Sequence, residues 1–158
     1  MKRACALAVL LLVACNGGTS GPGTGKIAPP WSDPLATGGK LTSASLHGDP
    51  VYLNFFATWC PPCNEEAPGI EKLEKRYAGR GLRIVGVDVE ENATLARRFR
   101  AKYGLTYPIL VDTGTLENLY RVNGLPVHVF IYRDGTIHRI VIGEMSSSEI
   151  RAEIRAIL

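Results

Sequence analysis

Apolar and polar blocks alternate along most of the chain, and five of the apolar blocks predict β-strands. The first is a continuous β-prone run, which is typical of a strand buried on both faces of a sheet, and the second also predicts a buried strand. The last two flank Asp134 and Gly135, a strong two-residue signal for a β-hairpin. The five blocks are residues 51–57, 82–89, 108–111, 127–133 and 136–142.

Apolar residues at helical spacing predict a helix in each of the first three gaps between these strands and another at the end of the chain. The last helix opens on a capping box formed by Ser146 and Glu149. Strands that alternate with helices and end in a hairpin imply an α/β fold, with a mixed central sheet covered by helices on both faces. The helices are marked by Ile70, Leu73 and Tyr77, by Leu95, Phe99 and Tyr103, by residues 116–122, and by Ile150, Ile154 and Ile157.

The start of the chain has the composition of an export signal. Lys2 and Arg3 precede an apolar run over residues 4–14, which as a helix rises only about 16 Å against roughly 30 Å of bilayer hydrocarbon. This pattern predicts a signal peptide over residues 1–14 rather than a membrane span. Cys15 follows directly, and Leu-Val-Ala-Cys resembles the lipobox of bacterial lipoproteins, which implies cleavage before Cys15 and a diacylglycerol on its sulfur. An ordinary signal peptide followed by an incidental cysteine is the alternative.

Residues 15–25 are expected to form the lipidated end and a flexible linker, because this stretch is dominated by glycine, serine and threonine. Residues 26–158 remain as one folded domain. The lipid would anchor that domain to a membrane on the side facing away from the cytoplasm, which is the periplasm in a Gram-negative host.

Composition and charge exclude two classes of protein. With 46% hydrophobic and 21% charged residues, the chain is globular rather than disordered. The net charge of +3 falls to +1, from 16 basic and 15 acidic residues, when Lys2 and Arg3 are left out. A nearly neutral domain lacks the basic surface that nucleic acid requires, so a nucleic-acid partner is not expected.

The expected chemistry lies at the two cysteines of the domain, Cys60 and Cys63. A disulfide between residues this close in sequence restricts the unfolded chain too little to serve as a structural staple. Cys-x-x-Cys is used for dithiol exchange or for zinc, but zinc needs two further ligands. The histidines His47, His128 and His138 do not stand at zinc-site spacing. The redox interpretation is favoured, and neither a metal nor another cofactor is expected.

The strand over residues 51–57 delivers Cys60 to the start of a helix. Pro61 and Pro62 cannot lie inside a helix but fit its first turn, where N–H groups have no partners. The helix dipole and free N–H groups stabilise a thiolate at this position, which makes Cys60 the candidate nucleophile. The two prolines also remove N–H groups near the sulfur, which favours the reducing direction.

These motifs resemble the thioredoxin fold and, within it, the TlpA/ResA-like thiol-disulfide oxidoreductases. The resemblance covers residues 26–158 and implies an N-terminal extension and a central insertion. The segments that carry it are Asn-Phe-Phe-Ala-Thr-Trp-Cys at 54–60, Pro-Pro-Cys at 61–63, Gly-Leu-Pro at 124–126, Ala-Pro-Pro-Trp at 28–31 and the insertion at 91–115.

The resemblance also implies roles for individual residues. Cys60 attacks the disulfide of a client protein, and Cys63 then resolves the mixed disulfide. Trp59, Leu125 and Pro126 border the client peptide, with Pro126 as a cis-proline that faces the dithiol. A trans proline at the start of a strand is the alternative for Pro126.

Cys63 must lose a proton before it can attack. Asn54 stands where thioredoxin has an aspartate, and an amide cannot accept this proton. Glu66 lies three residues after Cys63 on the same helix face and matches a glutamate of the ResA-like subgroup, so it is the candidate proton acceptor. The alternative is a solvated surface carboxylate, like its neighbour Glu65.

The implied function is a membrane-tethered, extracytoplasmic oxidoreductase that reduces disulfides of client proteins, such as apocytochrome c, with electrons from a membrane donor of the thiol-disulfide type. The alternative is a Sco-like copper carrier using Cys60, Cys63 and His128, although such proteins usually space the cysteines by three residues. A peroxiredoxin-type peroxidase is excluded because its Pro-x₃-Thr/Ser-x₂-Cys setting is absent around Cys60. For His128, a hydrogen-bonded position on a strand face is favoured over a role in the site.

Overall fold

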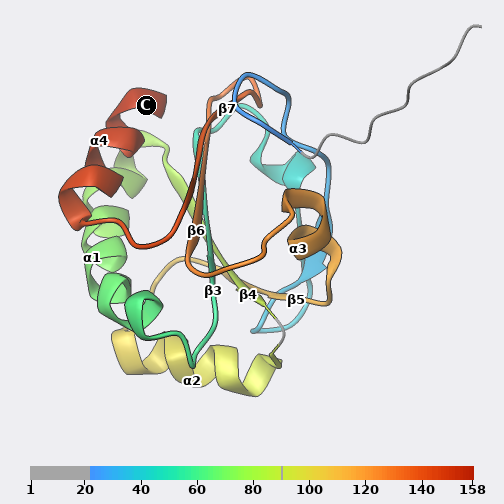
Figure 1. The fold of residues 1–158 in the computed structure, drawn as a ribbon, viewed down its shortest axis with the longest axis vertical. Helices are drawn as coiled ribbons and strands as arrows, with labels where there is room; N and C mark the ends of the chain where they lie inside the picture. The colour runs from blue at the N-terminus through green and yellow to red at the C-terminus, as the bar shows by residue number, and fades with distance from the viewer. Residues whose placement is uncertain (1–21, 90) are drawn as a thin grey trace, which may run out of the picture.

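A five-stranded mixed sheet forms the centre of the domain (Figure 1). The structure, a computed structural model, describes residues 22–89 and 91–158, so the predicted signal peptide and Cys15 lie outside the described residues. The strand order is β5-β4-β3-β6-β7, in which β3, β4 and β5 are parallel while β6 is antiparallel to both of its neighbours. All five predicted strands are confirmed. Their bounds are Val51–Phe56 for β3, Arg83–Val89 for β4, Ile109–Asp112 for β5, Val127–Ile131 for β6 and Ile137–Ile142 for β7.

Helices cover both faces of this sheet, as predicted. The crossovers from β3 to β4 and from β4 to β5 run in the same direction across the sheet, so the right-handed rule places α1 and α2 on one face. Helix α4 packs against α1 on that face, and α3 lies on the other (Figure 1). The bounds are Pro61–Tyr77 for α1, Ala93–Tyr103 for α2, Thr115–Tyr120 for α3 and Ser147–Ile157 for α4, with a short 3-10 helix, Ala78–Arg80, after α1.

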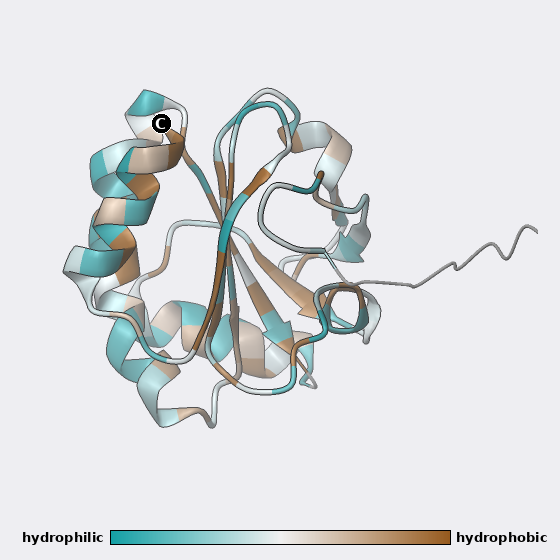
Figure 2. Ribbon diagram, turned by 45° about the horizontal axis from the view of Figure 1, so that its top comes forward, coloured by the Kyte–Doolittle hydropathy of each residue, from teal (hydrophilic) through white to brown (hydrophobic). Residues whose placement is uncertain are grey.

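Strand β3 lies at the centre of the core, and all six of its residues are buried. Alternate side chains point to opposite faces, so Phe56 stacks on Phe99 of α2 while Phe55 packs against Tyr120 of α3. Figure 2 shows the same division, with hydrophobic residues along the strands and on the inner sides of the helices. The turn that carries the two cysteines follows this strand directly and is therefore anchored to the core.

The N-terminal extension packs on the domain instead of trailing from it. Its two short strands form an antiparallel hairpin, and the buried Trp31 precedes the first of them. Leu35 forms a bridge to Leu110 of β5, and Ile27 forms one to Thr136. The elements are β1 at Ser32–Pro34, β2 at Lys40–Thr42 and a 3-10 helix at Ser43–Leu46.

The predicted insertion over residues 91–115 holds α2 and β5, and so supplies an edge strand together with a helix that flanks the active-site turn. Within residues 22–89 and 91–158, no helix has the length and apolar character needed to cross a membrane.

Candidate active site

Cys60 and Cys63 form a disulfide at the N-terminus of α1. Cys60 is the N-cap residue, and Pro61 and Pro62 occupy the first helical positions, as the sequence predicted. Neither proline has an N–H group, so Cys63 is the first helix residue that can donate, and its N–H reaches Sγ of Cys60 at 3.4 Å. Both cysteines are almost fully buried. The sulfur of Cys60 therefore receives one backbone hydrogen bond from the first turn of the helix.

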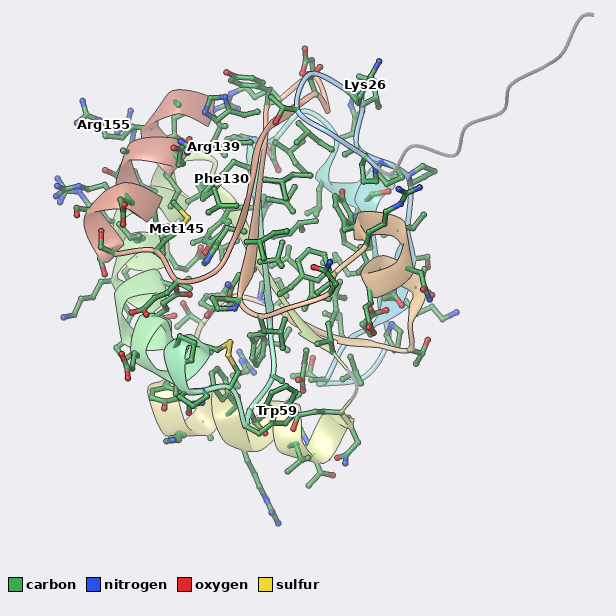
Figure 3. The ribbon with its side chains drawn as sticks, in the orientation of Figure 1. Lys26, Trp59, Phe130, Arg139, Met145 and Arg155 are labelled. Atoms are coloured by element: carbon green, nitrogen blue, oxygen red, sulfur yellow. A yellow bond between two sulfur atoms is a disulfide. The ribbon has the colours of Figure 1, made fainter. Side chains whose placement is uncertain are left out.

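A groove of about 490 Å³ opens beside the disulfide. Trp59 lies at the end of the molecule opposite Arg155 (Figure 3), and the residue is 64% exposed. The loop before β6 contributes Leu125, and the Leu125–Pro126 bond is cis, as predicted. The groove is lined by Trp59, Cys60, Pro61, Pro62, Val89, Glu117, Val122, Asn123, Gly124 and Leu125.

Glu66 is buried beneath this site. Its Oε1 accepts a hydrogen bond from the Met145 N–H at 2.7 Å, so a residue distant in sequence covers the carboxylate. Its Oε2 is also buried and receives no hydrogen bond from any described residue. The alternative of a solvated surface carboxylate is therefore wrong for Glu66, whereas Glu65 is exposed.

His128 occupies a hydrogen-bonded position on β6, as predicted. Its Nε2 lies 3.1 Å from the Gly143 carbonyl oxygen, which can only accept, so Nε2 carries the hydrogen. Its Nδ1 then accepts from the Tyr52 hydroxyl at 2.8 Å. Burial first, and then the nearby charge of Glu66, raises the pKa of Tyr52 well above its ordinary value, so this hydroxyl keeps its proton. The Oε1 atom of Glu66 lies 3.5 Å from Nε2, so the fully buried His128 is a neighbour of the Glu66 carboxylate.

The structure does not assemble Cys60, Cys63 and His128 into a metal centre. Both nitrogens of His128 already have hydrogen-bond partners. Among residues 22–89 and 91–158, no group of three or more His, Cys, Asp or Glu side chains could hold a metal ion. His128, the third ligand that the copper-binding alternative needs, is thus already engaged in two hydrogen bonds.

A polar clamp around Thr58 was not found from the sequence. The Thr58 N–H and hydroxyl donate to the two oxygens of the Glu91 carboxylate, at 2.5 and 2.6 Å. The Asn64 amide of α1 donates to the carbonyl oxygens of Thr58 and Cys60, at 2.9 and 2.8 Å. The Asn64 oxygen in turn accepts from the Tyr103 hydroxyl of α2 at 2.6 Å. The turn that carries the nucleophile is thus fixed from both sides.

Asp88, at the end of β4, lies behind this clamp and is wholly buried. Burial, followed by the hydrogen bond and charge of Glu91, raises its pKa from the ordinary 3.8 to about 9. For Glu91, burial acts to raise the pKa, but the hydrogen bonds from Asp88 and Thr58 outweigh it and hold the pKa below its usual value. The sequence offered one signal for this pair, a single acidic residue near the end of the apolar run 82–89.

A buried Cys-x-x-Cys disulfide at a helix N-terminus, beside a cis-proline loop on a mixed sheet, defines the class of thiol-disulfide oxidoreductases of the thioredoxin type. Residues 24–140 match the AhpC/TSA family, and the chain belongs to that family.

Comparison with individual proteins narrows this assignment. The chain is 31% identical over 147 residues to the thiol-disulfide oxidoreductase ResA of Bacillus subtilis strain 168, covering 92% of this chain and 82% of ResA. A putative thiol:disulfide interchange protein DsbE from Chlorobium tepidum has a TM-score of 0.79 at 27% identity, covering 85% of this chain and 97% of that protein. A secreted Mycobacterium tuberculosis disulfide oxidoreductase homologous to E. coli DsbE has a TM-score of 0.73 at 30% identity, covering 80% and 95%. The thioredoxin-like fold, the ResA-like family and the thiol-disulfide oxidoreductase activity are thereby confirmed.

Proposed function

We propose that the protein works as a reductase of disulfides in client proteins outside the cytoplasm. The observation that carries this direction is the hydrogen bonding of Cys60, whose sulfur receives one N–H because Pro61 and Pro62 have none to give. A strong oxidant such as DsbA depends on a highly stabilised reduced form. A less stabilised Cys60 thiolate makes the reduced state of this protein the better electron donor.

The exchange proceeds in two steps. The Cys60 thiolate attacks one sulfur of the client disulfide, forms a mixed disulfide and releases the other client sulfur as a thiolate. Cys63 then passes its proton to Glu66, attacks Cys60 and releases the second client sulfur, which leaves the Cys60–Cys63 disulfide. The client has gained two electrons, and a membrane-bound dithiol donor returns the pair to the reduced state.

The groove beside the disulfide supports a peptide-like client. Trp59 and Leu125 line it with apolar surface, and Pro126 continues the same loop into β6. An exposed aromatic ring beside a reactive sulfur favours an unfolded or extended segment, whose cysteine can reach a buried nucleophile. Apocytochrome c before haem attachment is a client of this kind.

We further propose that the domain over residues 26–158 is tethered by a lipid on Cys15 and a linker that ends at residue 25, after removal of the signal peptide over residues 1–14. The lipobox-like sequence supports the anchor, and the related M. tuberculosis protein is described as secreted. A tether of this kind keeps the reductase close to a membrane donor and lets it turn toward clients.

The reduction potential tests the direction of electron flow. We expect the Cys60–Cys63 couple to lie well below the potential of DsbA, which is about −120 mV. Equilibration of the purified protein with glutathione or dithiothreitol buffers, followed by quantification of free thiols, measures it. A potential at or above that of DsbA would make the protein an oxidase.

Replacement of the lipid attachment site tests the anchor. Cys15→Ser removes the sulfur that would carry the diacylglycerol, so we expect an uncut precursor or a product without acyl chains. Membrane fractionation and intact-mass measurement in the native host compare this variant with the parent. A mature parent protein that carries no acyl chain would overturn the tether while leaving the oxidoreductase activity untouched.

A further inference from the structure

Two carboxyl groups that the exchange reaction does not use lie directly behind the active-site turn. Asp88 pairs with Phe56 in the β3–β4 register, on the face where Phe56 packs against α2. Neither Asp88 oxygen receives a hydrogen bond from an N–H or hydroxyl group among the described residues, and the group that it contacts is the Glu91 carboxyl. Glu91 contacts Thr58, two residues before the nucleophile.

One proton is needed to hold this pair together. Two ionised carboxylates in contact repel each other, whereas a neutral carboxyl donates a strong charge-assisted hydrogen bond to a carboxylate. Glu91 already accepts two hydrogen bonds from Thr58, which favour its charged form. Asp88 is buried and receives no such hydrogen bond within the described part of the chain, so it is the member that carries the proton.

We propose that neutral Asp88 is a positioning residue, which donates its proton to Glu91 and thereby fixes Thr58 and the turn that carries Trp59 and Cys60. The inference rests on the proposed function only in assuming that this turn carries the reacting cysteine. The protonation state of Asp88 and Glu91 is independent of the direction of electron flow. The pair carries one negative charge in place of two, which limits the repulsion that the nearby Cys60 thiolate experiences.

The other groups around the turn complete its electrostatic setting. Glu91, from the loop between β4 and α2, is the charged group that acts on Asp88. From α2, Lys102 and Tyr103 donate to the oxygen of Asn64, whose amide holds Thr58 from the side of α1. In the reduced protein, the thiols of Cys60 and Cys63 are the titratable groups of the turn itself.

The pH dependence follows from the raised pKa of Asp88. Between its ordinary value of 3.8 and about 9, the folded protein holds a proton that the unfolded chain has lost. Stability falls with rising pH wherever the folded state binds more protons, so the contribution of Asp88 to the free energy of unfolding decreases across this window. Above about pH 9 Asp88 ionises, and the repulsion between the two carboxylates weakens the contact of Glu91 with Thr58.

Asp88→Asn in the full-length protein is the decisive variant. The Asn amide can donate to Glu91 as the neutral acid does, but it does not titrate. If Asp88 is neutral, this variant removes no charge, so we expect the alkylation rate of reduced Cys60 at pH 7 to stay within about twofold of that of the parent. If Asp88 were ionised, the variant would remove a full charge near the thiol, which would move the thiol pKa by an amount approaching one unit and the alkylation rate by about tenfold. Chemical denaturation between pH 5 and pH 9 should show a loss of stability in the parent that is smaller in the variant.

Asp88→Leu has a similar volume but no donor, so it should slow disulfide exchange at pH 7 several-fold, and Asp88→Asn should restore the rate. Glu144→Gln, which removes an exposed carboxyl group, serves as the control and should leave both profiles unchanged. Carbon-13 NMR of the carboxyl groups reads the titration of Asp88 directly, even if Asp88→Leu does not fold. Titration of Asp88 near its ordinary value, or a tenfold change in Cys60 alkylation in Asp88→Asn at pH 7, would overturn the proposal. Neither result depends on the reduction potential.

Discussion

Cys63→Ser should turn the protein into a trap for its clients. Cys60 keeps its place as the N-cap of α1 and can still attack a client disulfide. The second step has lost its nucleophile, so the mixed disulfide persists. The serine hydroxyl is too weakly acidic to replace a thiolate in this attack. Affinity purification from the native host under acid-quenched, non-reducing conditions, followed by mass spectrometry, should recover the clients covalently attached to Cys60.

Cys60→Ser is the matched control, because it removes the attacking sulfur and leaves Cys63 buried behind it. It should retain no clients, and turnover of a model disulfide should fall on the order of a thousandfold or more, as when a catalytic nucleophile is removed. If instead Cys60→Ser captures the clients and Cys63→Ser does not, the order of attack is reversed. Capture of folded proteins with no cysteine would show that the groove binds without exchange.

The five strands of the central sheet and the four α-helices were predictable because each has a local cause, whereas the short strands β1 and β2 were not predicted. Apolar, β-prone runs mark the strands, the Ser146–Glu149 box starts α4, and the Asp134–Gly135 turn joins β6 to β7. The position of the dithiol was predictable for the same reason, since Pro61 and Pro62 favour the first turn of a helix.

The surroundings of the dithiol could not be predicted in this way. Glu91 lies 33 residues from Thr58, and Met145 lies 79 residues from Glu66. These contacts form only when the chain has folded, and the burial that keeps Asp88 neutral is a property of the packed core. Helical spacing places Glu66 beside Cys63, but it does not reveal that the segment around Met145 covers the carboxylate. Sequence patterns thus identified the two cysteines, whereas the packing of the folded chain sets the protonation of the acidic side chains around them.

Glu66→Gln should separate the two steps of the reaction. The amide oxygen can still accept the Met145 N–H, and glutamate and glutamine have similar helix propensities, so the fold should be retained. Attack by Cys60 should change little, because the Cys63 N–H and the N-terminus of α1 still stabilise its thiolate. Resolution by Cys63 should slow by about a hundredfold near neutral pH, the lower range for loss of a general base. Mixed disulfides with a model substrate should therefore accumulate in rapid-quench experiments.

Raising the pH should rescue this variant, because Cys63 then ionises directly and no longer needs an acceptor. Glu65→Gln is the control, since it alters the adjacent but exposed carboxylate. Stopped-flow measurements of both steps from pH 6 to pH 10 distinguish a proton acceptor from a structural carboxylate. A structural role would lower both rates by the same factor at every pH. If both rates are the same in Glu66→Gln, Glu65→Gln and the parent at every pH, Glu66 is not the proton acceptor and Cys63 loses its proton to solvent. The Oε2 atom of Glu66 has no hydrogen-bond partner among residues 22–89 and 91–158 and is buried on the same helix face as Cys63, which favours a specific delay in the second step.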